Sequence, residues 1–188
     1  MFYIPVILGS TRRGRRSPRV ARFMADRIRR SGRAEAEILD LLECDFPLMQ
    51  ERLSELGEPP PRLREFGERV ARADAVVIVS PEYNGGYPGV LKNALDYLLP
   101  EYKRKPVGVV TVSVGGLGGY SCLSQLRQVL LSMGAVPIPA LLPVSRVQDS
   151  FAEDGTPTDP AYERRAEGFI TELIWFAEAL SAQKAKSP

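Results

Sequence analysis

Residues 75–99 read AVVIVSPEYNGGYPGVLKNALDYLL, and this stretch decides the fold. Its first five residues form an unbroken apolar run, which predicts a strand buried on both faces. From Val90 onward, apolar residues recur at helical spacing, with Lys92 and Asp96 paired on the opposite face. Between them lies a polar and aromatic loop, PEYNGGYP, at the carboxyl end of the strand. Ligands bind at this position in open α/β sheets, although Pro, Asn and Gly also build ordinary turns.

The same order of strand and then helix recurs along the chain. We expect strands at 3–8, 36–42, 75–79, 106–113 and 136–142. Pro5 is interpreted as the opening residue of the first strand, and Ser17 as the N-cap of the first helix. Pro137 and Pro139 suit an edge strand. Five such alternations predict an α/β fold, a flavodoxin-like doubly wound five-stranded parallel sheet in the order 2-1-3-4-5.

Length and composition limit the classes of protein to consider. The 188 residues fit one domain, which we place at 1–181, followed by a mobile tail at 182–188. Apolar runs are too short for a membrane span and no signal-peptide pattern is present, so we expect a cytoplasmic protein. Cys44 and Cys122 lack metal-ligand spacing and are expected to be free thiols. The long loop at 43–60 could line a ligand site, form a subunit contact or pack on the core.

The chain contains no histidine. This excludes a histidine general base, Ser/His and Cys/His triads, and most zinc enzymes. Any chemistry must therefore come from carboxylates, tyrosine, arginine, backbone amides or a bound cofactor.

The loop after the first strand, GSTRRGRRS at 9–17, places hydroxyls, amides and guanidiniums at a helix N-terminus, which suits a phosphate. A P-loop would need Lys and Ser or Thr where Arg15 and Arg16 stand. A dinucleotide-binding turn would need two further glycines, although Asp40 could serve as its ribose-binding acid. The phosphate of a mononucleotide, held by Ser10, Arg12 and Ser17, requires nothing that is missing.

The loop after the fourth strand, SVGGLGG at 113–119, is rich enough in glycine for its backbone to approach a flat ring closely. In the predicted sheet it lies beside the 81–88 loop, where Tyr83 offers an aromatic wall and Asn84 offers hydrogen bonds. A phosphate site on the first loop and a site for a planar ring on the other two describe a bound FMN.

The stretches GSTRRGRRS, PEYNGGYPGVLKNALDYL and SVGGLGGY closely resemble the NADPH-dependent FMN reductases, which include azoreductase-, chromate-reductase- and quinone-reductase-like members. The resemblance covers residues 3–180. It implies bound FMN, NADPH or NADH as hydride donor, and a quinone, azo compound, metal oxyanion or free flavin as small-molecule acceptor. It also implies a homodimer or homotetramer. FMN itself would carry the hydride, so no side chain is expected to be catalytic. The FMN-binding residues it implies are Ser10, Thr11, Arg12, Arg16 and Ser17 for the phosphate, and Pro81, Glu82, Tyr83, Asn84, Ser113, Gly115 and Gly116 for the ring.

Two other classes of protein remain as alternatives. A flavodoxin-type one-electron carrier would share the fold and cofactor, but such carriers are strongly acidic and this chain has a net charge of +2. Ten arginines lie between Arg12 and Arg33, which could bind nucleic acid, yet no aromatic residues are spaced for base stacking. We therefore expect neither a nucleic acid nor a membrane as partner. The surplus of apolar residues at 83–99 predicts that this region also packs against a second subunit.

Overall fold

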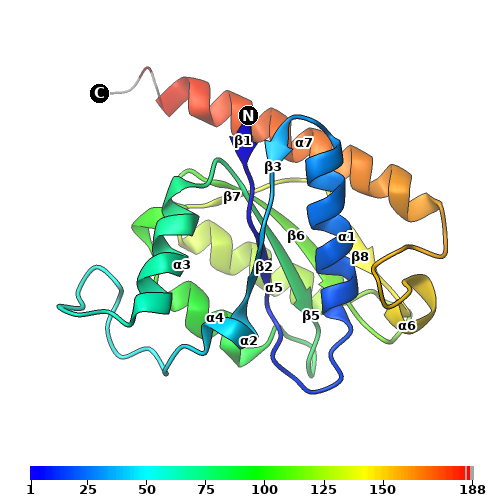
Figure 1. The fold of residues 1–188 in the computed structure, drawn as a ribbon, viewed down its shortest axis with the longest axis horizontal. Helices are drawn as coiled ribbons and strands as arrows, with labels where there is room; N and C mark the ends of the chain where they lie inside the picture. The colour runs from blue at the N-terminus through cyan, green and yellow to red at the C-terminus, as the bar shows by residue number, and fades with distance from the viewer. Residues whose placement is uncertain (185, 187–188) are drawn as a thin grey trace.

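The computed structural model describes residues 1–184 and 186 of the chain. Helices surround a central sheet (Figure 1). The strands are β1 (Phe2–Tyr3), β2 (Val6–Leu8), β3 (Ala34–Glu35), β4 (Ile38–Asp40), β5 (Val76–Pro81), β6 (Pro106–Val112), β7 (Val136–Pro137) and β8 (Leu142–Val144). The helices are α1 (Ser17–Arg30), α2 (Leu41–Cys44), α3 (Pro61–Arg72), α4 (Gly89–Asp96), the 3₁₀-helix η1 (Pro100–Tyr102), α5 (Tyr120–Ser132), α6 (Val147–Ser150) and α7 (Ala161–Lys184).

The main sheet is parallel and has the strand order β4-β2-β5-β6-β7, with β8 also paired to β6. β1 and β3 extend β2 and β4 in the same register, because Phe2 pairs with Ala34 and Val6 with Ile38. The first and fifth expected strands are thus each present as two short pieces, whereas the second is present as β4 and is preceded by β3, which lies outside the expected range. Taken in chain order, the arrangement is 2-1-3-4-5, which confirms the predicted topology and places the proline-bearing strand at the edge.

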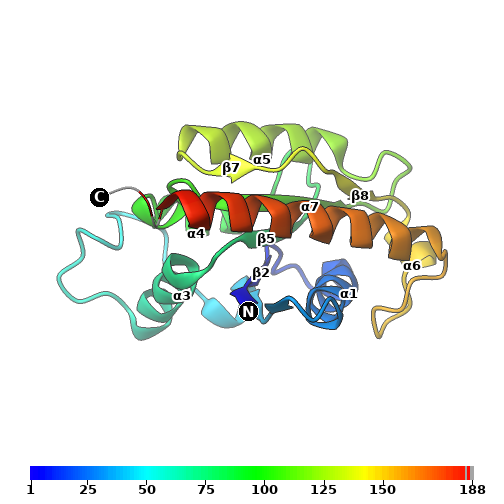
Figure 2. The same cartoon turned by 90° about the horizontal axis from the view of Figure 1, so that it is seen from above.

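Two apolar clusters cover the two faces of the sheet. Val6 and Val77 pack with α1 and α7 on one face, whereas Ile7 and Ile78 pack with α3, α4 and α5 on the other. Figure 2 shows the helices on both sides of the strands. Strand residues such as Val77 and Ile78 are completely buried, as an unbroken apolar run requires. The prediction of one domain over 1–181 stays a prediction.

Proline interrupts the first strand instead of opening it. Pairing begins upstream at Phe2 and resumes at Val6, so the placement of Pro5 at the start of the strand was wrong. Pro5 has no N–H to donate, which breaks the strand into β1 and β2. Its carbonyl still accepts a 3.0 Å hydrogen bond from Val77 N, so the connection to β5 is kept.

The second strand ends earlier than expected, at Asp40. The Asp40 side chain accepts a hydrogen bond from Leu42 N at 3.0 Å, and this N-cap starts the short helix α2 in place of strand residues 41 and 42. At the other end of the chain, α7 continues to Lys184, beyond the expected end near Leu180. Of the predicted tail, residues 182–184 therefore belong to this helix, and residues 185, 187 and 188 lie outside the described part of the chain.

The long loop packs on the core and covers α4. Met49 N donates to Asn93 Oδ1 at 2.8 Å, and the Tyr97 hydroxyl donates to Pro47 O at 3.1 Å. The ring of Phe46 contacts that of Tyr97 edge-on, with the centroids 6.0 Å apart. Much of the apolar surplus that predicted a subunit contact at 83–99 is thus covered within the chain itself.

Candidate functional site

Three loops meet at the carboxyl ends of β2, β5 and β6 and enclose a cavity of about 350 Å³. Figure 1 shows the connections after β2 and β5 at the lower edge of the sheet. The volume lies in the range of small-molecule sites, roughly 300–1,000 Å³. The cavity is lined by Arg12, Arg13, Gly14, Arg15, Arg16, Ser17, Pro81, Glu82, Tyr83, Val112, Ser113, Val114 and Val147.

The N-terminus of α1 opens onto this cavity without a cap. Its N-cap residue is Arg16, no side chain makes a capping hydrogen bond, and the first turn contains no acidic residue. The expectation that Ser17 caps the helix was wrong, because Ser17 is its first helical residue and its hydroxyl lies 2.5 Å from that of the fully buried Ser10. An uncapped helix N-terminus carries partial positive charge and attracts an anion.

The ten arginines between Arg12 and Arg33 divide into two groups. Arg12 and Arg13 are exposed, and their side chains make no hydrogen bond or ion pair with any described residue. The others contact carboxylates, carbonyls or an amide, and they are Arg15, Arg16, Arg19, Arg22, Arg27, Arg29, Arg30 and Arg33. Half of this basic cluster is therefore paired with carboxylates, and the two guanidiniums without any partner among the described residues lie at the cavity.

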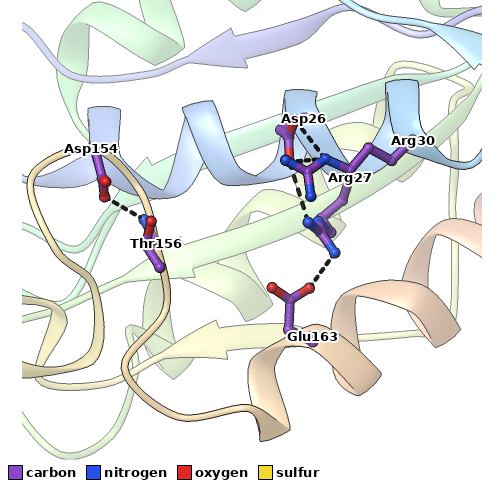
Figure 3. A network of polar contacts seen from close by, with 6 residues as sticks. All are labelled: Asp26, Arg27, Arg30, Asp154, Thr156 and Glu163. Atoms are coloured by element: carbon purple, nitrogen blue, oxygen red, sulfur yellow. Dashed lines mark hydrogen bonds and ion pairs between the residues drawn. The ribbon is translucent and has the colours of Figure 1, made fainter.

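Figure 3 shows one of these internal networks, in which Arg27 of α1 reaches Glu163 of α7. Arg27 Nη1 lies 2.6 Å from Glu163 Oε2, and Asp26 contacts Arg30 Nε at 2.9 Å. These pairs connect α1 to α7 or join neighbours on α1. The expectation that nucleic acid is not a partner stays a prediction.

The 81–88 loop contains a tight turn, and its first residues line the cavity. Tyr83 and Gly86 exchange backbone hydrogen bonds of 2.8 and 3.0 Å, and Asn84 and Gly85 between them have φ values of +50° and +77°. These are the features of a type I′ turn, which favours Asn-Gly. Asn84 is therefore at an exposed turn and does not line the cavity, whereas Tyr83 does.

Glu82 connects this loop to α5. Its Oε2 accepts a hydrogen bond from Cys122 N at 3.0 Å in the first turn of α5, where a carboxylate is favourable. Cys122 itself is completely buried, and burial raises the pKa of its thiol to about 11. Such a thiol stays protonated at neutral pH, so it is not a nucleophile in this site.

In the 113–119 loop, the glycines with a backbone conformation that favours glycine are not the ones that were proposed to approach the ring. Gly118 and Gly119 have φ values of +64° and +79°, and a Cβ on Gly119 would lie 3.0 Å from Thr111 Cβ. Gly115 and Gly116 have open space around them and lie outside the set of lining residues.

The structure thus brings together most of the residues proposed from sequence. Seven of the twelve line the cavity, namely Arg12, Arg16, Ser17, Pro81, Glu82, Tyr83 and Ser113. Five do not, namely Ser10, Thr11, Asn84, Gly115 and Gly116. Among the lining residues that sequence reasoning missed, Val147 comes from α6, which follows the edge strand. No sequence motif identifies Val147 as a site residue. A backbone hydrogen bond from Val147 N to Ser113 O, 3.1 Å long, holds it beside the cavity.

Asp40 does not face the cavity as a ribose-binding acid would. It forms a bidentate ion pair with Arg15 and caps α2, so the dinucleotide-binding alternative lacks its acidic residue.

Residues 3–149 match the family model described as NADPH-dependent FMN reductase. The chain belongs to this family. It is 38% identical over 172 residues to an NAD(P)H-dependent FMN reductase of Schizosaccharomyces pombe, covering 85% of this chain and 80% of that protein. It is 31% identical over 179 residues to an FMN-dependent NADPH-azoreductase of Staphylococcus aureus, covering 91% and 93%.

A solved structure agrees with this assignment. FerB, a flavoenzyme NAD(P)H:acceptor oxidoreductase of Paracoccus denitrificans, matches with a TM-score of 0.80 and 26% identity, covering 95% of this chain and 98% of FerB. FMN and NAD(P)H are the cofactors of the family, and its members are oxidoreductases. Among the described residues, no helix is both long and apolar enough to cross a bilayer.

Proposed function

We propose that the cavity binds FMN and that the chain transfers hydride from NAD(P)H to a small-molecule acceptor. One observation carries this proposal. Two unpaired arginines and an uncapped helix N-terminus lie at one part of a cavity that Tyr83 and valines line elsewhere. An anion and a flat apolar ring in one ligand match these two surfaces.

The residues then have distinct roles. Arg12, Arg13 and the α1 N-terminus bind the phosphate, with Ser17 beside them and Arg16 at the rim. Pro81, Tyr83 and Val112 orient the ring and exclude water from it. When bound, FMN supplies the hydride chemistry. The absence of histidine is consistent with this division, because the side chains only bind and position.

For the acceptor, we propose a flat apolar molecule such as a quinone or an azo compound, in preference to a metal oxyanion or a free flavin. Val114 at the cavity is 64% exposed, Leu117 on the same loop is 84% exposed, and Tyr120 at the start of α5 is 57% exposed. These side chains offer apolar surface beside the ring site. They offer no additional charge for an oxyanion.

We further propose a homodimer or homotetramer and a cytoplasmic location. The exposed apolar side chains of Val114, Leu117 and Tyr120 support assembly, since monomers rarely leave apolar side chains together in water. Cys44 and Cys122 are free thiols, which is usual in a reducing compartment.

The experiment is an absorption spectrum of the purified protein, reconstituted with FMN if necessary, before and after NADPH is added without oxygen. We expect the visible flavin bands to remain with the protein after gel filtration, to bleach with NADPH and to return when a quinone is added. A protein that retains no FMN, or retains it without bleaching, would contradict the proposal. A variant at the remote Glu163, Glu163→Gln, is the control for general damage and should behave as wild type.

A further inference from the structure

Arg15 differs from the other arginines of the 10–17 loop in what it contacts. Its Nη1 lies 2.6 Å from Asp40 Oδ1 and its Nη2 lies 2.6 Å from Asp40 Oδ2. The two side chains are only 15% and 14% exposed. A bidentate pair with so little exposure is held far more firmly than a surface ion pair.

The same guanidinium closes the loop on itself. Arg15 Nη1 also donates to the carbonyl of Ser10, at the other end of the segment. Arg15 N donates to Arg12 O at 3.2 Å, which forms a turn between them. Arg15 therefore joins both ends of the loop to Asp40.

Asp40 is itself fixed by the sheet. It is the last residue of β4, where it is in register with Leu8, the last residue of β2. Its Oδ1 accepts from Leu42 N as the cap of α2. The carboxylate is thus anchored by a strand and a helix, level with the point where the loop leaves the sheet.

The ends of the loop are also held by the contact between the Ser10 and Ser17 hydroxyls, but residues 11–14 between them have few contacts. A Cβ on Gly14 would meet no atom within 4 Å, and the side chains of Thr11, Arg12 and Arg13 make no hydrogen bond with described residues. The contacts of Arg15 with Ser10 O and Arg12 O are therefore the main ones that fix where this segment places the free guanidiniums.

We propose that Asp40 is a positioning residue, which acts through Arg15 to set the 10–17 loop so that Arg12 and Arg13 face the phosphate of the ligand. Asp40 does not line the cavity. The inference rests on the proposed function, in that it takes the anion to be the FMN phosphate.

The test compares FMN with riboflavin, which has the same ring and no phosphate. Asp40→Asn keeps an acceptor for Leu42 N and removes the charge that orients Arg15. We expect about a tenfold weaker affinity for FMN, as the loss of charge-assisted contacts implies, and an unchanged affinity for riboflavin, both measured by flavin fluorescence titration of the apoprotein. The matched control is Glu163→Gln, which breaks the 2.6 Å pair with Arg27 away from the cavity and should change neither affinity.

A second readout needs no ligand. In the apoprotein, the amide of Arg15, which donates to Arg12 O, should exchange hydrogen faster in Asp40→Asn than in wild type, while those of β5 should not. If Asp40→Asn does not fold, Arg15→Lys keeps the charge but loses the bidentate contact, and the same selective loss of FMN affinity is expected.

The outcomes separate the two proposals. A wild-type protein that binds FMN no more tightly than riboflavin would refute the phosphate site of the proposed function. A wild type that prefers FMN, with variants that keep this preference in full, would refute the role of Asp40 alone. Equal weakening of both flavins would also refute it, because it would show general damage to the fold.

Discussion

At the scale of single residues, the 10–17 loop shows that identical side chains have different roles. Arg12 and Arg15 are three positions apart, yet one is free at the cavity and the other is paired with Asp40. The sequence predicted a phosphate site here from the kinds of residue present. It could not predict which arginine is free, because that depends on the register that brings Asp40 next to the loop, 25 residues along the chain.

Arg12→Ala tests the phosphate site directly. Removing one charge-assisted contact should weaken FMN binding by about 1.5–3 kcal/mol. Riboflavin should bind the variant and the wild type equally, which fluorescence titration of both flavins measures. Arg29→Ala is a suitable control. Arg29 lies near the C-terminal end of α1, away from the cavity, and its side chain donates to Ala36 O. Undiminished FMN affinity in Arg12→Ala would remove Arg12 from the site.

At the scale of elements, short-range rules predicted the kind of each element better than its ends. The strand at 36–42 ends at Asp40 because that side chain caps α2, and the helix at 17 begins without a cap because its N-cap residue is Arg16, whose side chain has no acceptor. Both depend on the polar side chain that stands at the boundary. Alternation of apolar residues does not carry that information.

The start of α5 offers a test by pH. Burial raises the pKa of Cys122 to about 11, so the folded protein keeps the proton where the unfolded chain, with a thiol pKa near 9.0, releases it. The thiol therefore favours unfolding as pH rises from about 9 to 11 and has no such effect below pH 9. The free energy of unfolding of wild type minus that of Cys122→Ala should fall by up to about 2 kcal/mol across this interval. Urea unfolding at a series of pH values measures it, and a difference that does not vary with pH would contradict the assignment.

At the scale of the whole molecule, the sheet order followed from sequence because it depends on a coarse pattern. Five alternations of strand and helix, with two prolines in the last strand, allow few arrangements. Assembly stays a prediction. The apolar residues near Tyr97 that predicted a subunit contact are covered by the 45–60 loop. Only the folded structure shows that Leu117 is far more exposed to solvent than Tyr97.

Light scattering of the FMN-loaded protein tests assembly. At micromolar concentration we expect the mass of a dimer or tetramer, and Leu117→Asp should shift it toward the monomer by placing a charge in the contact. Leu48→Asp is a matched control, because Leu48 is equally exposed at 84% but lies in the other loop. A wild-type protein that is monomeric with FMN bound would refute the assembly.

The internal pairing of the α1 arginines also bears on how ligands arrive. Carboxylates pair with five of the ten arginines, whereas Arg12 and Arg13 have no such partner among the described residues and place positive potential at the mouth of one cavity. Phosphate-bearing molecules diffusing past the surface are drawn toward that point, so their encounter rate rises at low ionic strength. Molecules without charge gain nothing from this field and would reach the cavity by random collision alone.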